Sequence, residues 1–111
     1  MEGIWTITQT WQGIPAYKFS ATFAANGTIT VDGGYFGVWD RLGNSNQVSL
    51  AIANFGQSSI TAYVGNVVGP AMGGQMTGCT KGGTPLHGEW SAAQQQHADA
   101  VQGALRPPGE R

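Results

Sequence analysis

The sequence predicts an all-β fold: an eight-stranded antiparallel up-and-down barrel, followed by a short C-terminal tail that is helical or disordered. Short segments alternate between apolar and polar residues, which is the period of a β-strand. Turn residues separate these segments at intervals of roughly ten residues, a spacing typical of a barrel or sandwich. A Gly-x-Trp motif returns at residues 3–5, 37–39 and 88–90. Because alternate side chains share a face, each glycine leaves room for an indole nearby, and we expect the three tryptophans to meet inside.

Composition limits the class of partner. Only 10% of the 111 residues are charged and the net charge is −1, which argues against nucleic acid and anionic lipid. The apolar runs are far shorter than a bilayer span, and the first residues lack the regions of a signal peptide. The single cysteine, Cys79, fits either redox compartment. We therefore expect one soluble domain, cytoplasmic or secreted with its leader removed.

The expected strands cover residues 4–12, 17–23, 28–31, 35–41, 48–54, 60–64, 72–78 and 86–90. In the first four, the face rich in large apolar residues is assigned to the interior. The opposite face is mostly threonine, serine and charged residues in the first three, whereas in the fourth it carries Phe36 and Val38. The inward residues are Trp5, Ile7, Gln9 and Trp11, then Tyr17, Phe19, Ala21 and Phe23, then Ile29 and Val31, then Tyr35, Gly37 and Trp39. Asn26-Gly27 predicts a type I′ hairpin, because both residues tolerate positive φ.

In the last four strands the same alternation assigns an inner face to every second residue. The inward residues are Val48, Leu50, Ile52 and Asn54, then Ile60, Ala62 and Val64, then Met72, Gly74, Met76 and Gly78, then Leu86, Gly88 and Trp90. Tyr63 is thereby assigned to the outside. Hairpin-length links favour a meander, and pairing of the first and last strands would leave no bare edge. An open two-sheet sandwich is the alternative.

Residues 93–111 differ in composition from the barrel domain at residues 1–92. They are rich in alanine and glutamine and end in Pro107-Pro108-Gly109 and two charged residues. Residues 92–105 are compatible with a short helix that has Ser91 as its N-cap. We expect this tail to cover one barrel mouth or to fray.

The motif Gly3-Ile4-Trp5 on the first strand, with the meander over residues 3–92, resembles the calycin group of barrels: the lipocalins, avidins and fatty-acid-binding proteins. The length and the repeated tryptophans are most similar to the avidin branch. The resemblance implies a calycin-type fold that encloses a ligand. It does not imply biotin binding, because the polar residues by which avidins hold biotin have no residue-by-residue counterpart. The lipocalins' late arginine has none either, since the last strand offers only His87 and Glu89.

Inward aromatic and amide residues form the candidate site. An eight-stranded barrel has a size at which side chains either fill the interior or leave room for one small ligand. Large aromatics with a few placed polar groups are typical of a pocket wall. Buried amides need a hydrogen-bond partner, which a ligand, water or the backbone supplies. The candidate ligand-binding residues are Trp5, Gln9, Tyr17, Phe19, Tyr35, Trp39, Asn54, Met76 and Trp90.

No motif predicts catalysis, a metal or a cofactor. His87 and Glu89 share a strand face, which the alternation turns outward, so we interpret them as a solvated pair. The two histidines, His87 and His97, have no supporting cluster of ligands. We therefore expect no catalytic residue, no metal site and no cofactor.

The leading hypothesis is a non-enzymatic barrel that binds a small apolar or aromatic molecule. One alternative is a barrel isomerase or cyclase that acts by shape, with Tyr17 or Tyr35 as proton donor. The other is a structural or assembly module with a filled interior.

The outer face of the fourth to sixth strands predicts assembly. Phe36, Val38, Ala51, Ala53 and Tyr63 are assigned to it, and sequential strands of a meander are neighbours in space. Larger exposed apolar patches tend to mark interfaces. We expect a homodimer or higher homo-oligomer through these five residues.

Overall fold

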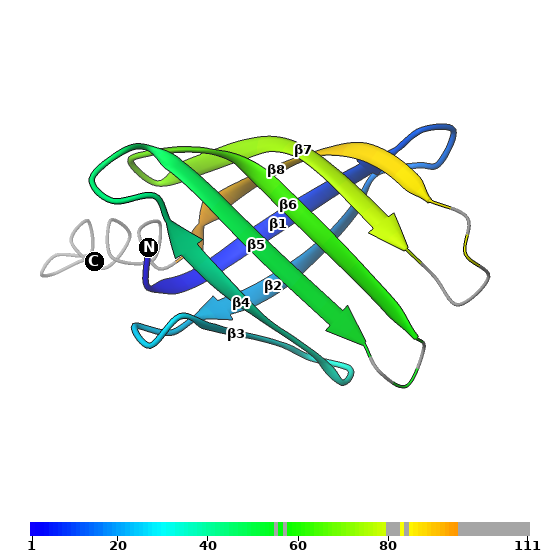
Figure 1. The fold of residues 1–111 in the computed structure, drawn as a ribbon, viewed down its shortest axis with the longest axis horizontal. Helices are drawn as coiled ribbons and strands as arrows, with labels where there is room; N and C mark the ends of the chain where they lie inside the picture. The colour runs from blue at the N-terminus through cyan, green and yellow to red at the C-terminus, as the bar shows by residue number, and fades with distance from the viewer. Residues whose placement is uncertain (55, 57, 80–82, 84, 96–111) are drawn as a thin grey trace, which may run out of the picture.

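The computed structural model describes residues 1–54, 56, 58–79, 83 and 85–95. Within them the chain forms eight strands: β1 (Gly3–Trp11), β2 (Tyr17–Phe23), β3 (Thr28–Val31), β4 (Tyr35–Arg41), β5 (Gln47–Asn54), β6 (Ser59–Val68), β7 (Ala71–Cys79) and β8 (Leu86–Gln94). Each strand pairs antiparallel with the next, and β1 pairs with β8 (Figure 1). The predicted fold is confirmed, and the closed barrel excludes the open sandwich.

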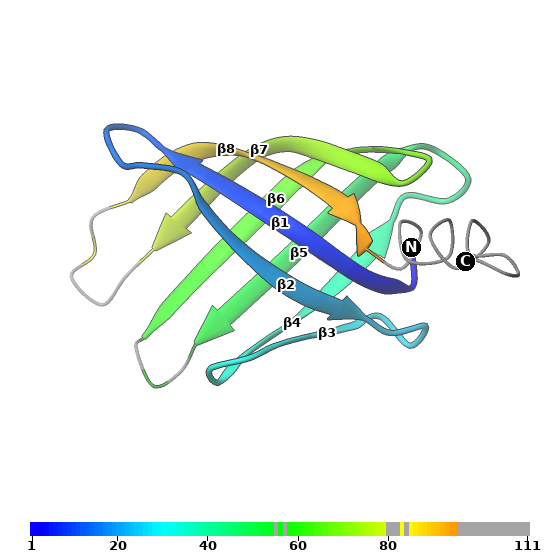
Figure 2. The same ribbon diagram turned by 180° about the vertical axis from the view of Figure 1, so that it is seen from behind.

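The barrel has two unlike ends, which both views show (Figures 1 and 2). The N-terminus and the turns that join β2 to β3, β4 to β5 and β6 to β7 lie at one end, which we call the N-terminal end. The last residues of β1, β3, β5 and β7 lie at the other, which we call the distal end. A molecule that enters the barrel therefore meets different residues at each end.

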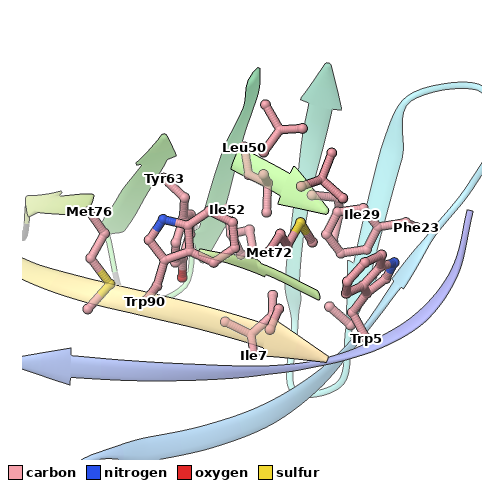
Figure 3. Close-up of a cluster of buried hydrophobic side chains, with 14 residues drawn as sticks. Trp5, Ile7, Phe23, Ile29, Leu50, Ile52, Tyr63, Met72, Met76 and Trp90 are labelled. Carbon is pink, nitrogen blue, oxygen red and sulfur yellow. The ribbon is translucent and has the colours of Figure 1, made fainter. Parts of the chain in front are cut away.

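The N-terminal end is filled with aromatic side chains (Figure 3). The ring centroid of Phe23 lies 6.1 Å from that of Trp5 and 6.1 Å from that of Trp39. Trp5 Nε1 donates to the Met1 carbonyl at 2.9 Å, and Trp39 Nε1 donates to the Ala24 carbonyl at 3.0 Å. Backbone acceptors therefore satisfy both indoles, as burial requires.

The third motif tryptophan packs elsewhere. Trp90 meets the ring of Tyr63 edge to face at 5.5 Å, and its Nε1 donates to the Val64 carbonyl at 3.1 Å. All three tryptophans face inward and share one hydrophobic core, in which Trp5 and Trp39 pack around Phe23 while Trp90 packs against Tyr63.

The expected inner face of β6 is wrong. The Tyr63 side chain is 1% exposed, whereas Ile60 is 51% and Val64 55% exposed. Tyr63 pairs with Leu50 on β5 and Met76 on β7, and directly paired residues share a face. Both faces of β6 carry apolar residues, so alternation is ambiguous there. The register with β5 and β7 decides it, because a slip of one residue would expose the large ring.

Glycines let neighbouring strands or rings approach each other. A Cβ on Gly37 would lie 2.0 Å from the backbone oxygen of Ala51, so this glycine makes room for β5 and not for an indole. A Cβ on Gly88 would lie 3.1 Å from the ring of Trp11, and one on Gly78 would lie 2.9 Å from it. The expectation that a motif glycine leaves room for an indole therefore holds at Gly88 and is wrong at Gly37.

Two further expectations are corrected at the chain's turns and tail. The Asn26-Gly27 hairpin is present, but among the described residues only glycines and Ser58 have positive φ, so the turn is not type I′. Asn26 Oδ1 instead accepts hydrogen bonds from the Thr28 backbone N–H and hydroxyl. Strand β8 continues to Gln94, so residues 92–94 are strand and not helix. The rest of the predicted tail, from residue 96, lies outside the described residues.

We expect Gly37→Ala to lower the free energy of unfolding by at least about 3 kcal/mol, because the new Cβ must displace the β5 backbone. Val38→Ala, on the exposed side of the same strand, is the control and should cost about 1 kcal/mol or less. Urea unfolding followed by tryptophan fluorescence measures both values. Equal values for the two variants would contradict the close approach of β4 and β5.

Candidate functional site

The interior is hollow at the distal end. A cavity of about 400 Å³ lies there, within the range typical of small-molecule sites. Segments of β2 form one side, and residues from the ends of β3 to β6 form the other. Among the described residues, the lining consists of Gln9, Tyr17, Lys18, Phe19, Ser20, Val31, Asp32, Tyr35, Ile52, Ser59, Thr61 and Tyr63.

A pair of polar side chains joins opposite walls of this cavity. Gln9 Nε2 on β1 donates to the Tyr63 hydroxyl on β6 at 2.5 Å. Gln9 Oε1 accepts from Trp11 Nε1 at 3.3 Å. The half-buried Gln9 amide is therefore held by two other side chains, which fixes its orientation. The Tyr63 hydroxyl keeps its own proton for donation.

Burial keeps Tyr63 neutral. Removal of the ring from water raises the pKa of the Tyr63 hydroxyl to about 12, although hydrogen bonds with Gln9 and Thr61 act in the opposite direction. Tyr63 is therefore a neutral hydrogen-bond donor over the whole physiological range of pH.

Aromatic rings form the entrance to the cavity. Tyr17 and Phe19 stack with ring centroids 6.0 Å apart and an interplanar angle of 29°. Tyr17 is exposed, whereas Phe19 and Tyr35 are half-buried and pack against the core. A flat apolar group that enters between these rings would lose its contact with water, which favours binding.

The structure brings four of the nine predicted site residues together. Gln9, Tyr17, Phe19 and Tyr35 line the cavity. The other five lie elsewhere: Trp5 and Trp39 at the N-terminal end, Met76 and Trp90 in the buried core, and Asn54 at the end of β5.

Asn54 has a structural role in this arrangement. It is buried, and its Nδ2 donates to the Gly33 carbonyl at 3.3 Å, which ties β5 to the β3–β4 turn. The sequence left open whether an inward amide bonds a ligand, water or the backbone. Asn54 bonds the backbone, whereas Gln9 bonds the side chains of Tyr63 and Trp11.

Sequence reasoning missed three lining residues of β6: it turned Thr61 and Tyr63 outward, and Ser59 lies before the start of the strand that it predicted. The size of its side chain could have identified Tyr63. It is the largest side chain of β6, and burial of its ring stabilises the fold more than burial of the Ala62 methyl group. Lys18, Ser20 and Asp32 were missed because their side chains belong to an outer face or a turn.

A second hollow, of about 810 Å³, lies outside the barrel over β4 to β7. Its described lining contains charged, amide and glycine residues, such as Asp40, Arg41 and Asn66, but no aromatic ring. Aromatic rings are typical of the walls of small-molecule sites, and the inner cavity has Tyr17, Phe19, Tyr35 and Tyr63, so it is the better candidate despite its smaller volume.

Other reactive residues are dispersed. His87 and Glu89 are exposed on β8, as expected, and Cys79 is a free, exposed thiol at the end of β7. In the described part of the chain, histidine, cysteine and carboxylate residues form no group of three that could hold a metal ion. The same residues include no helix that is long and apolar enough to cross a membrane.

Comparison of this chain with protein-family models, curated proteins and solved structures finds no match. The class is therefore defined by the architecture alone: an eight-stranded antiparallel closed β-barrel, which is consistent with a calycin-type fold.

The raised pKa of Tyr63 predicts a loss of stability in alkali. Tyrosine in the unfolded chain ionises near pH 10, whereas the folded side chain keeps its proton up to about pH 12. The stabilisation is complete below pH 10 and is lost as pH rises towards 12, by up to roughly 2 to 3 kcal/mol. Tyr63→Phe should lack this part of the pH dependence. Urea unfolding at several pH values between 9 and 12 tests it, and an identical slope in both proteins would contradict the assignment.

Proposed function

We propose that this protein binds a small, mostly apolar or aromatic molecule in the distal cavity, as an avidin-like or lipocalin-like barrel does. The observation that carries the proposal is a hollow of about 400 Å³ lined by the stacked pair Tyr17 and Phe19 and by Tyr35, with Gln9 and Tyr63 as its fixed polar pair. Apolar walls supply affinity, and a few oriented polar groups supply specificity.

The polar pair defines what the ligand should present. The Tyr63 hydroxyl is neutral and has a proton to donate, so it suits a hydrogen-bond acceptor such as a carbonyl or ether oxygen. A ligand without such a group would leave this donor without a new partner, which costs affinity. The ligand class is thus a ring compound with one acceptor near its buried end.

A neutral fluorescent naphthylamine that carries a ketone, 6-propionyl-2-(dimethylamino)naphthalene, is a suitable probe for the cavity, because its carbonyl supplies an acceptor for the Tyr63 hydroxyl. We expect its emission to rise on binding to the wild type, and Ser59→Trp to reduce the affinity at least tenfold because the new indole occupies the cavity. The control Ser49→Trp places the same residue on the exposed face of β5 and should leave the affinity unchanged.

Circular dichroism should show both tryptophan variants folded. Equal affinities of the two variants for the probe would show that it binds outside the cavity and would contradict the proposal. Recovery of a natural ligand in chemically altered form would instead favour the isomerase or cyclase alternative.

We also propose that the outer face of β4, β5 and β6 joins two copies of the chain. Tyr63 does not belong to this face, because it points into the barrel. Two rows cross these strands: Phe36, Ala53 and Ile60, then Val38, Ala51 and Ala62. Phe36, Val38, Ile60 and Ala62 are exposed, whereas Ala51 is half-buried and Ala53 is buried. An uncharged face of this kind fits a second copy across a two-fold axis.

We expect Val38→Glu to convert a wild-type dimer into a folded monomer, because the substitution puts like charges near the two-fold axis. The mass from light scattering at micromolar concentration measures the change. Lys18→Glu, an exposed charge change on β2, is the control and should keep the wild-type mass. A monomeric wild type would rule out this interface.

A further inference from the structure

Among the described residues, the first half of β2 has a strand neighbour on one side only. On the β1 side its pairing extends from Phe23 to Tyr17. On the β3 side the pairing stops at Ala21 opposite Val31. Strand β3 has four residues, because the turn sequences at Asn26-Gly27 and Asp32-Gly33-Gly34 leave no more between them. Within the part of the chain that the structure describes, residues 17–20 of β2 therefore form an edge that no strand pairs with on the β3 side, which we call the β2 edge.

The hydrogen-bond pattern shows which backbone groups this edge presents. The Ala24 N–H donates to the Thr28 carbonyl at 2.9 Å, so Ala24 and Thr28 bond each other across the β2–β3 turn. In an antiparallel ladder, bonding to a given neighbour recurs at every second residue. The residues of β2 that bond towards β3 are therefore the even-numbered ones. The backbone N–H and C=O of Lys18 and the N–H of Ser20 consequently point across the β2 edge.

The β2 edge borders the cavity. Lys18 and Ser20 belong to its lining although they occupy the outward face of β2, which the exposure of both residues shows. Their inward neighbours Tyr17 and Phe19 supply the stacked rings at the entrance. Figure 2 shows β2 diverging from the β3–β4 hairpin towards the distal end. The cavity is thus open sideways, along a strand that has unused backbone donors and acceptors.

We propose that the β2 edge takes up a short extended peptide as an added strand, one of whose aromatic side chains enters the distal cavity. This inference rests on the proposed function and specifies its ligand as a peptide. Backbone donors and acceptors that recur every second residue are matched by another extended backbone, which is the basis of β-strand addition. The peptide residue opposite Phe19 would point into the barrel, and its two neighbours would bond Lys18 and Ser20.

A tyrosine is the side chain that best fits this cavity. Its ring would lie between the aromatic residues of the entrance, and its hydroxyl could accept a hydrogen bond from Tyr63 or from the second N–H of Gln9. The probe is therefore acetyl-Thr-Thr-Tyr-Thr-Thr-amide, because threonine favours the extended conformation. Binding is followed by NMR titration of the ¹⁵N-labelled full chain, where weak binding still shifts amide resonances.

Two matched pairs test the inference. N-methylation of the two threonines beside the tyrosine blocks the N–H groups that face β2 and should weaken binding at least tenfold. N-methylation of the tyrosine blocks an N–H that faces away and should have a smaller effect. In the protein, Lys18→Pro removes the edge N–H without loss of a bond to β1, since proline is tolerated at a strand edge. It should weaken binding at least tenfold relative to Lys18→Ala, which keeps that N–H.

The naphthylamine probe distinguishes this inference from the proposed function. If Lys18→Pro and Lys18→Ala bind that dye with equal affinity and only Lys18→Pro loses the peptide, the β2 edge is the peptide site. If the dye binds and the peptide does not, or if both N-methylated peptides bind equally, the inference is overturned and the proposed function stands. If neither binds, both fail. A dimer that Lys18→Pro splits, without peptide binding, would show that the edge pairs with a second copy instead.

Discussion

The pairing of β1 with β8 is the constraint on which the rest of the structure depends. It runs over seven residue pairs, from Trp5 opposite Gln94 to Trp11 opposite Gly88. Closure turns the inner faces of all eight strands towards one narrow volume, so every inward side chain must fit with all the others. Without it, the first and last strands would be bare edges and the aromatic core would be open to water.

Closure does not fill the interior evenly. At the N-terminal end, Trp5, Phe23 and Trp39 occupy the barrel, and backbone carbonyls satisfy the two indoles. Towards the distal end the inward residues include Gln9, Ser59 and Thr61, which are polar and, on β6, small. The short β3 strand also leaves the wall incomplete beside β2. A stable core and an accessible hollow therefore occupy opposite halves of one barrel.

The contact between Gln9 and Tyr63 connects stability with function. It joins β1 to β6 across the barrel, between strands that are not neighbours in the sheet. A polar pair inside a barrel is costly unless its groups are bonded, and Trp11 supplies the partner of the amide oxygen. The pair therefore holds the walls in register and at the same time presents oriented polar atoms to the cavity, and both proposals for the ligand use those atoms.

The sequence by itself determined the strand number, the order and the inner faces of seven strands, because in each of those strands the larger apolar residues are concentrated on one face. It also placed Gln9, Tyr17, Phe19 and Tyr35 inside. It did not determine the inner face of β6, where Ile60 and Val64 compete with Tyr63 and only the register with β5 and β7 selects the ring. Nor did it distinguish the positions of Trp39 and Tyr35 along the barrel. Both are inward aromatics of β4, but Trp39 fills the N-terminal end and Tyr35 lines the cavity. Alternation along a strand specifies a side chain's face, but its depth in the barrel and its neighbours across the interior depend on closure, which only the tertiary structure contains.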